Sequence, residues 1–266
     1  MAALTFDKLE GLGNDFVVID ARASGELMSA ARAVALCDRH RGIGADGVIS
    51  LLPSRVPEAR LRMHLYNADG SVAEMCGNGL RCVIRAVLGE EPSEKIWVDT
   101  DAGLRSGEAL GGGRFRVSLG QPKILSERLS VRAEGRDFSG TWVSMGNPHF
   151  VVDLLEEAPL PLAERLGPLL ERAPVFPERS NIELFRKKAG GGLELVVFER
   201  GAGLTQACGT GAGATVVAAQ RRGWVPPGPV EVELPGGALR VELRSEGVLI
   251  EGPARHVFQG RVDGPR

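Results

Sequence analysis

Two cysteines occupy nearly the same local setting, and both could act as an acid or a base. Cys208 comes after an apolar strand pattern and a glycine-rich stretch, and before a run of small apolar residues that predicts a helix. Cys76 is followed in the same way by Gly-Asn-Gly and a helical stripe. A cysteine at a helix N-terminus lies at the positive end of the helix dipole, beside unpaired N–H groups. We therefore expect a lowered pKa and a reactive thiolate at Cys208.

The two cysteine motifs also share their upstream spacing. Cys76 lies nine positions after Asn67 (76 − 67), and Cys208 lies nine positions after Glu199 (208 − 199). Each helix that follows is expected to end at a glycine, at position 89 in one motif and at position 223 in the other. The cysteines themselves are 132 residues apart (208 − 76).

A second pair of motifs repeats at almost the same offset. Gly13-Asn14-Asp15 and Gly146-Asn147-Pro148 both precede an apolar run, and their asparagines are 133 residues apart (147 − 14), half of the 266-residue chain. Two motifs repeated at one offset predict a duplicated domain. We expect an α+β fold of two pseudosymmetric lobes that face each other, with the active site at the seam and both cysteines near it. The expected lobes are residues 1–119, with a C-terminal return of residues 256–266, and residues 120–255.

Short runs with apolar alternation predict the strands of these lobes. They cover residues 6–10, 16–20, 48–52, 61–66, 95–99, 114–119, 140–143, 193–198, 230–234, 238–243 and 247–251. Helical spacing is expected over residues 27–39, 80–88 and 161–172 and after Cys208.

Two thiols in facing lobes indicate a specific reaction. One thiolate could remove a proton from a carbon while the other thiol donates a proton to the opposite face, which inverts the stereocentre. The α-proton of an amino acid is very weakly acidic, so the developing negative charge needs electrostatic stabilisation. Two helix N-termini could supply it, and exclusion of water would raise the basicity of the thiolate.

Other chemistries are less well supported by the sequence. No lysine motif indicates pyridoxal phosphate, no C-x-x-C pair occurs, and the chain has four His, so we expect neither a cofactor nor a metal. The glycine-rich helix N-termini could instead bind phosphate, but neither has a Walker-type lysine. Gly42-x-Gly44-x-x-Gly47 has dinucleotide-fingerprint spacing, but it follows a helix and precedes a strand, the reverse of the required order. Cys37 and Cys82 lie inside predicted helices and are expected to be buried apolar residues.

Composition restricts the class of protein. Hydrophobic residues make up 43% of the chain and charged residues 25%, as in globular proteins. The net charge of −2 indicates no nucleic-acid partner and no acidic membrane surface. Because residues 1–9 lack a signal-peptide pattern and no apolar run approaches about 20 residues, we expect no membrane partner and a cytoplasmic location.

The few asparagines also indicate a polar site. Only five occur, and four lie in tight-turn motifs: Asn14, Asn67, Asn78 and Asn147. Turn chemistry alone could explain any one of them, because asparagine tolerates left-handed backbone. As a set they favour a binding site. His149 lies beside Asn147, although it could simply cap that turn, and Glu199 could simply pair with Arg200.

These motifs together resemble the diaminopimelate epimerases. The resemblance rests on residues 11–16, 42–47, 67–71, 76–82, 146–149, 199–203 and 207–211, which span nearly the whole chain. Members of that family interconvert LL- and meso-diaminopimelate without a cofactor, on the route to lysine and peptidoglycan precursors. The resemblance implies two lobes, each a curled, mostly antiparallel sheet around a central helix, and a homodimer.

The resemblance also implies roles for individual residues. The catalytic residues would be Cys76 and Cys208 as the acid–base pair, assisted by His149 and Glu199. The substrate, a small amino acid with two carboxylates and two ammonium groups, would be bound by a set of polar and glycine residues: Asn14, Asn67, Gly77, Asn78, Asn147, Asn181, Glu199, Arg200, Gly209 and Thr210.

Two positions depart from the family pattern. Some members have Gln where this chain has Gly47, and many have Glu where it has Leu204. Neither departure involves a cysteine, so we expect them to change substrate affinity only. Two other functions stay open at this point: a binding protein that lacks activity, and a cofactor-free racemase or isomerase acting on another small acid. The sequence does not determine which cysteine is the resting thiolate.

Overall fold

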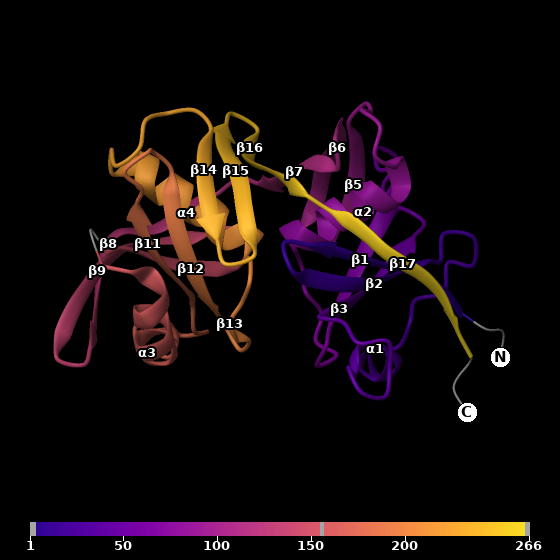
Figure 1. Ribbon diagram of the computed structural model, residues 1–266, viewed down its shortest axis with the longest axis horizontal. Helices are drawn as coiled ribbons and strands as arrows, with labels where there is room; N and C mark the ends of the chain where they lie inside the picture. The colour runs from indigo at the N-terminus through magenta and orange to yellow at the C-terminus, as the bar shows by residue number, and fades with distance from the viewer. Residues whose placement is uncertain (1–3, 155–156, 264–266) are drawn as a thin grey trace. The chain divides into compact units, whose positions relative to one another are not determined.

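The computed structural model describes residues 4–154 and 157–263 of the chain. The chain forms two compact units, one made of residues 1–118 and 252–266 and the other of residues 119–251. We call them unit 1 and unit 2. Each is built on a strongly curved sheet with helices packed against it (Figure 1).

Unit 1 follows a mixed strand order. Strand β1 (Leu4–Gly11) pairs antiparallel with β2 (Asn14–Asp20) and β17 (Arg255–Val262). Strand β2 pairs parallel with β3 (Gly47–Leu52), and β3 pairs antiparallel with β4 (Leu61–Asn67). Strand β4 then pairs parallel with β5 (Ile96–Thr100), which continues antiparallel through β6 (Gly103–Gly111) to β7 (Arg114–Gly120). Helix α1 (Ala30–Cys37) precedes β3, and helix α2 (Gly77–Leu88) precedes β5.

Unit 2 repeats this order. Strand β9 (Arg136–Ser144) pairs antiparallel with β10 (Pro148–Asp153) and β8 (Lys123–Ala133). Strand β10 pairs parallel with β11 (Asn181–Lys187), and β11 pairs antiparallel with β12 (Leu193–Glu199). Strand β12 pairs parallel with β14 (Val230–Leu234) and antiparallel with the short β13 (Gly203–Leu204). Strands β15 (Gly237–Arg244) and β16 (Gly247–Pro253) complete the antiparallel end. Helix α3 (Pro159–Glu171) precedes β11, and helix α4 (Gly209–Arg221) precedes β14.

The two units therefore match element by element, with β1 to β7 corresponding in order to β9, β10, β11, β12, β14, β15 and β16. The outermost strand also corresponds, because β17 pairs with β1 as β8 pairs with β9. In unit 1 this strand is supplied by the end of the chain, which runs beside β1 in Figure 1. The predicted α+β fold of two duplicated lobes, each a mostly antiparallel curled sheet with a central helix, is confirmed.

The central helices are α2 in unit 1 and α4 in unit 2. The first eight residues of α2, Gly77–Ile84, are buried, and α2 contacts β1, β2, β4 and β6. Every residue of α4 from position 209 to 219 is buried, and α4 contacts β9, β10, β11 and β15. Glycine and alanine dominate the start of α4, and their small side chains let the surrounding strands approach the helix closely. Gly89, with φ of 78°, ends α2 as the sequence predicted.

The observed elements differ from the predicted ones in a few places. Helix α1 is shorter than the predicted 27–39 because Ser29 caps its N-terminus, accepting a hydrogen bond from the backbone N of Arg32. Strands β6, β8, β10, β11, β13 and β17 lie outside the predicted strand ranges. In β8 two register shifts, between Ile124 and Ser126 and between Ser126 and Leu129, break the alternation that marks a strand.

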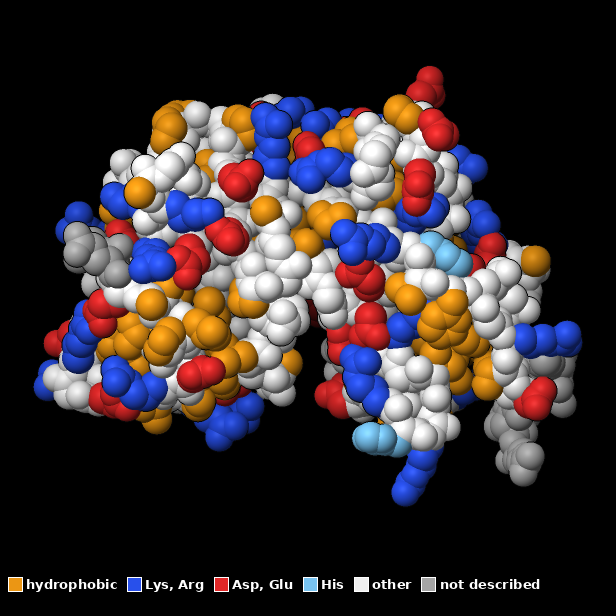
Figure 2. Space-filling view, viewed as in Figure 1, with side chains coloured by type: hydrophobic (Ala, Val, Ile, Leu, Met, Phe, Trp, Pro, Cys, Tyr) orange, Lys and Arg blue, Asp and Glu red, His pale blue; other side chains and the backbone are white. Residues whose placement is uncertain are grey.

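The face that Figure 2 shows carries no large field of charge of one sign. On the face that Figure 2 shows, basic and acidic side chains are interspersed, and hydrophobic side chains group over the α3 part of unit 2. Leu160 and Leu169 of α3 are among the exposed large hydrophobic residues. No described helix combines the length and hydrophobicity that a membrane-spanning segment requires.

Candidate functional site

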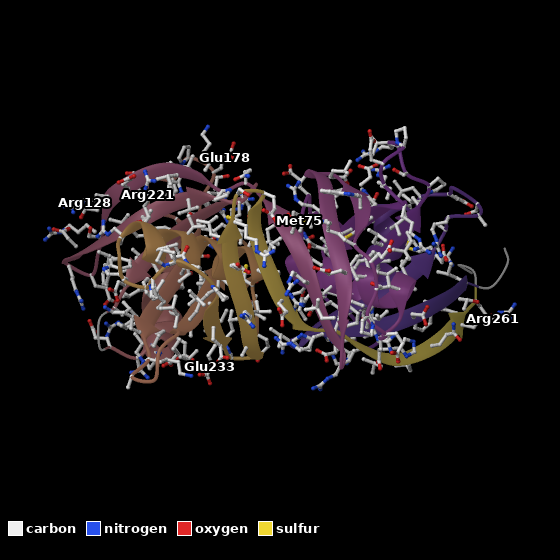
Figure 3. All side chains as sticks on the ribbon, turned by 90° about the horizontal axis from the view of Figure 1, so that it is seen from above. Met75, Arg128, Glu178, Arg221, Glu233 and Arg261 are labelled. Carbon is white, nitrogen blue, oxygen red and sulfur yellow. The ribbon has the colours of Figure 1, made fainter. Side chains whose placement is uncertain are left out.

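Cys76 is the N-cap of α2 in unit 1. Its backbone is extended, with φ of −142° and ψ of 112°, and its Sγ accepts a hydrogen bond from the backbone N of Gly79 at 3.3 Å. The thiol is half-buried and donates towards Asn14 Oδ1, 3.9 Å away. Figure 3 labels Met75, the residue that leads into this N-cap. The arrangement places sulfur beside the free N–H groups of a helix start, where negative charge is stabilised.

The amide of Asn14 is held by an acidic residue that the sequence analysis did not single out. Asn14 Nδ2 donates to Asp46 Oδ2 at 2.9 Å, and the same oxygen accepts the backbone N–H of Asp15 at 3.0 Å. Arg39 donates to Asp46 Oδ1 at 2.7 Å and to Asp15 Oδ1 at 2.8 Å. A carboxylate only accepts hydrogen bonds, so it fixes the amide nitrogen towards Asp46 and leaves Oδ1 for Cys76.

The other predicted residues of unit 1 lie around the same helix start. Asn67 ends β4, is half-buried, and donates from Nδ2 to Ser71 Oγ at 3.0 Å. Gly77 and Asn78 are buried in the first turn of α2. Asn78 Oδ1 accepts from the fully buried Arg81 at 3.0 Å, so part of its side chain braces the helix start.

Cys208 is the N-cap of α4 in unit 2 and repeats the geometry of Cys76. Its φ and ψ are −119° and 109°, and its Sγ accepts from the backbone N of Gly211 at 3.4 Å. Thr210 Oγ1 lies 3.4 Å from the sulfur. Gly209 and Thr210 are both buried in the first turn of α4. The predicted helix-start geometry is thus present in both units.

The expected low pKa of Cys208 is wrong. Burial raises the pKa of Cys208 well above its ordinary value, and the negative charge of Glu199 raises it further. The hydrogen bonds from Thr210 and the backbone N of Gly211 act in the opposite direction but do not compensate. Only 5% of Cys208 is exposed, so removing the thiolate from water outweighs the helix dipole. The raised pKa favours the thiol form of Cys208, and a thiolate formed there would be a stronger base.

The predicted Glu199 ends β12, and the predicted Arg200 follows it in the loop to β13. Thr205 Oγ1 donates to Glu199 Oε1 at 2.6 Å. The backbone N of Arg200 donates to Asn181 Oδ1 at 2.9 Å, and Asn181 Nδ2 donates to the backbone O of Pro148 at 2.8 Å. Asn181 thus ties this loop to the start of β10.

Two further contacts shape that loop. The backbone N of Gly201 donates to Oε1 of the buried Glu171 at 3.0 Å. The exposed Arg200 side chain donates to the backbone O of Glu178 at 3.2 Å, and Figure 3 labels Glu178 on unit 2. The guanidinium keeps further N–H donors for an anionic ligand.

His149 lies in β10 and is completely buried. Its Nδ1 is 2.6 Å from Glu183 Oε1, and its Nε2 is 2.9 Å from Oδ1 of the half-buried Asn147. His149 pairs with Asn181 in the register of β10 and β11, and Glu183 lies two residues further along β11. The structure thus brings together His149, Asn147 and Asn181, all predicted, with one residue that was not.

Sequence reasoning missed four residues that hold the predicted ones in place: Asp46, Glu171, Glu183 and Thr205. Two of them had a usable signal. Asp46 lies inside the glycine-rich stretch Gly42–Gly47, and Glu183 lies two residues after Asn181, on the same face of a strand. Glu171 and Thr205 had no such signal in the sequence. Their contacts with Gly201 and Glu199 depend on the folded conformation of residues 199–203.

The two departures from the family pattern have different structural settings. A Cβ atom at Gly47 would lie 2.7 Å from the backbone O of Tyr66 and 2.9 Å from a side-chain carbon of Leu65. Any side chain at this position therefore requires a shift of β4. Leu204 is 38% exposed in β13, so its position is open to a different side chain.

Each unit thus carries a helix-capping thiol with polar side chains held around it. Within residues 4–154 and 157–263, no three His, Cys, Asp or Glu side chains group in a way that could hold a metal ion. The groups present can transfer protons, donate hydrogen bonds to an anion, and pair with charged groups.

Comparison with protein families gives one match over most of the chain. The family model for diaminopimelate epimerase matches residues 6–125 and 141–257. A diaminopimelate epimerase of Thermosynechococcus vestitus is 43% identical over 286 aligned positions, covering 98% of this chain and 99% of that protein. One from Stutzerimonas stutzeri is 40% identical, covering 97% of this chain and 99% of that protein.

Solved structures share the fold at low sequence identity. A hydroxyproline epimerase from Agrobacterium vitis, with bound trans-4-hydroxy-L-proline, matches with a TM-score of 0.76 at 17% identity, covering 98% of this chain and 92% of that one. A methylitaconate-delta-isomerase matches with a TM-score of 0.63 at 14% identity, covering 98% of this chain and 95% of that one. These structures establish the shared architecture.

Proposed function

Because the chain belongs to the diaminopimelate epimerase family, we propose that it interconverts LL- and meso-2,6-diaminopimelate, a step that supplies lysine and peptidoglycan precursors. The observation that carries this proposal is the matched pair of helix-capping cysteines, Cys76 on α2 and Cys208 on α4. The enzyme is an isomerase that uses no cofactor.

The two thiols act on opposite faces of one α-carbon. The cysteine in its thiolate form removes the α-proton, the C–H bond breaks, and its electron pair stays on the carbon. The thiol of the other cysteine gives its proton to the opposite face, so that a new C–H bond forms. The first cysteine leaves as a thiol and the second as a thiolate, and the reverse reaction exchanges their roles.

Backbone N–H groups of the two helix starts stabilise the charge that develops on the reacting carboxylate. Those after Cys76 belong to Gly77 and Asn78, and those after Cys208 belong to Gly209 and Thr210. The buried setting of Cys208 supports this role, because exclusion of water strengthens each of these interactions and makes the thiolate more basic.

Polar side chains select the rest of the substrate. Arg200 has free donors for a carboxylate, and Glu199 can accept from an ammonium group. The asparagines of the predicted set complete the binding of a zwitterion through donors and acceptors: Asn14, Asn67, Asn147 and Asn181. Gly47 and Leu204 lack the Gln and Glu side chains that the family resemblance implies for some and for many members, so we expect weaker binding from these two positions and no change in the reaction.

Deuterium exchange tests the proposal directly. Purified protein is incubated with LL-diaminopimelate in deuterium oxide without added cofactor. We expect deuterium at one α-carbon by mass spectrometry, and meso product by chiral chromatography. Cys76→Ala and Cys208→Ala should each abolish epimerisation.

One competing substrate and three possible outcomes separate this function from the alternatives. The fold match to a hydroxyproline epimerase makes trans-4-hydroxy-L-proline the matched competing substrate. Exchange with that compound but not with LL-diaminopimelate would show a racemase or epimerase of another acid. Tight binding of diaminopimelate without any exchange would show a binding protein. Wild-type rates in either cysteine variant would refute the two-thiol reaction.

The family resemblance also supports a cytoplasmic homodimer as the working form. Analytical ultracentrifugation of the purified chain at micromolar concentration should give about twice the 28.3 kDa chain mass. A monomer that is fully active at the same concentration would contradict this part of the proposal.

A further inference from the structure

The His149–Glu183 pair is an unusual feature of the core of unit 2. Neither side chain has any exposed surface, and the nitrogen and oxygen are 2.6 Å apart. Among the described residues, the second carboxyl oxygen, Glu183 Oε2, has no hydrogen-bond partner. Burying such a pair is costly compared with burying apolar side chains of similar volume.

The equivalent place in unit 1 is apolar. Phe16 pairs with Gly47 between β2 and β3 as His149 pairs with Asn181 between β10 and β11. Two residues further along, Ile49 therefore corresponds to Glu183.

The glycines of the central helices confirm this correspondence. A Cβ at Gly79 of α2 would lie 3.2 Å from the side chain of Ile49, and a Cβ at Gly211 of α4 would lie 3.0 Å from Glu183 Oε1. The same fold is thus built in unit 1 with a phenylalanine and an isoleucine at these positions. The polar pair in unit 2 is not required by the architecture.

The hydrogen-bond chain determines where the protons lie. Asn147 turns its carbonyl oxygen to His149 Nε2, so Nε2 must carry a proton and donate it. Nδ1 and Glu183 Oε1 then share a single proton. Burial raises the pKa of Glu183, and the neighbouring His149 opposes this rise. A neutral carboxylic acid that donates to a neutral imidazole needs no charge in this dry environment.

This chain of contacts orients the amide of Asn147. With Oδ1 occupied by His149, the NH₂ group is directed away from the ring and can donate to a ligand. The corresponding Asn14 is held the other way round, because its NH₂ group donates to Asp46 and its oxygen remains for Cys76. The two equivalent asparagines therefore offer opposite hydrogen-bonding groups, as a zwitterionic ligand with both donors and acceptors requires.

We propose that Glu183 is a positioning residue, which as a neutral acid donates to His149 Nδ1, fixes the imidazole proton on Nε2, and thereby holds Asn147 with its NH₂ group available to a substrate carboxylate. This role rests on the proposed function for its ligand, but the proton arrangement exists in the free protein. Glu183 touches no substrate and acts only through His149.

The sharpest test replaces His149 and Glu183 by the residue types of their unit 1 counterparts, Phe16 and Ile49. We expect Glu183→Ile and the double variant His149→Phe/Glu183→Ile to fold, because apolar replacement of a buried polar pair is often neutral or stabilising. Their kcat/KM for LL-diaminopimelate should fall about 10- to 100-fold, mainly through KM, as when a supporting partner of a ligand-binding residue is lost.

Glu183→Gln should rescue most of the activity that Glu183→Ile loses, since the glutamine NH₂ group can also donate to Nδ1. Glu194→Gln on the neighbouring strand β12, where the carboxylate meets Arg186 at the surface, is the matched control and should change nothing. An active Glu183→Ile variant overturns the proposal. If both variants fold and Glu183→Gln is as impaired as Glu183→Ile, the claim that Glu183 acts as a neutral hydrogen-bond donor is overturned.

The proton positions are measured without substrate. In protein labelled with ¹⁵N-histidine, NMR should show the His149 proton on Nε2 in wild type and in Glu183→Gln, and a mixture of tautomers in Glu183→Ile. An unprotonated His149 Nε2 in the wild-type protein would overturn the proposal. Because this readout needs no turnover, it stays decisive even if diaminopimelate proves not to be the substrate.

Discussion

Cys208 Sγ accepts a hydrogen bond from the backbone N of Gly211 at 3.4 Å, so the proposed catalytic thiol is also the cap of helix α4. The same double role belongs to Cys76, which accepts from Gly79 at 3.3 Å. Because the proposed reaction adds a second role to the capping role of each sulfur, substitutions can separate stability from chemistry.

Cys208→Ser should keep the cap and lose the reaction. Serine is a preferred N-cap residue, so the free energy of unfolding should stay close to that of wild type, whereas Cys208→Ala should lose about 1 kcal/mol. Neither variant should epimerise, since a hydroxyl group is far too weak an acid to be present as its anion. Urea unfolding and deuterium exchange measure the two effects. Cys37→Ala, at the buried end of α1, is the control and should retain activity.

Gly211→Ala should impair the reaction more than Gly190→Ala. A Cβ at Gly211 would lie 3.0 Å from Glu183 Oε1 and 3.3 Å from the sulfur of Cys208, whereas a Cβ at Gly190 meets nothing within 4 Å. The Gly211→Ala substitution must displace the Cys208 thiol or the Glu183 carboxyl group. Displacements of about 1 Å in an active site can reduce the rate about 100-fold. Steady-state kinetics on both variants measures this difference. Equal kcat values would show that the start of α4 tolerates the shift.

Glu199→Gln should make Cys208 easier to deprotonate. After burial, the charge of Glu199 is the next largest cause of the raised pKa of Cys208. Removing that charge lowers the pKa, so the rise in alkylation rate with pH should move to lower pH. Iodoacetamide labelling of the Cys208 peptide across a pH series, followed by mass spectrometry, measures this. Glu194→Gln should leave the profile in place. If the pH profile of Cys208 alkylation is the same in Glu199→Gln as in wild type, the charge of Glu199 does not influence the pKa of Cys208.

Asp15 should contribute stability that depends on pH. Burial alone would raise its pKa, but hydrogen bonds from Arg39 and Lys8 outweigh burial and lower the pKa to about 2 from 3.8. A carboxylate with a depressed pKa stabilises the fold fully above its unfolded value, and this contribution disappears as the pH falls from 3.8 through about 2. The difference in unfolding free energy between wild type and Asp15→Asn should therefore be constant at neutral pH and shrink below pH 3.8.

Urea unfolding from pH 2 to pH 7 measures this difference. Asp137→Asn provides the comparison, because its carboxylate is exposed and reaches Arg132 only at 3.5 Å. Exposed pairs of this kind contribute little to stability. A difference for Asp15→Asn that persists unchanged at pH 2 would contradict the assignment.

Repetition and turn chemistry made much of this protein predictable from its sequence. Two motifs at offsets of 132 and 133 residues were enough to predict duplicated lobes. The helix starts at Cys76 and Cys208 followed from glycine and small-residue patterns. Such features are local, because a helix start depends on a few adjacent residues whose types are visible in the chain.

The electrostatics and the supporting partners needed the folded structure. The pKa of Cys208 depends on how completely α4 is enclosed, and the helix position alone gave the wrong direction. Glu183 meets His149 across 34 residues, and Asp46 meets Asn14 across 32. These contacts arise from the parallel pairing of β10 with β11 and of β2 with β3. Burial and long-range pairing are properties of the whole chain, so the residue types visible in either segment could not reveal them.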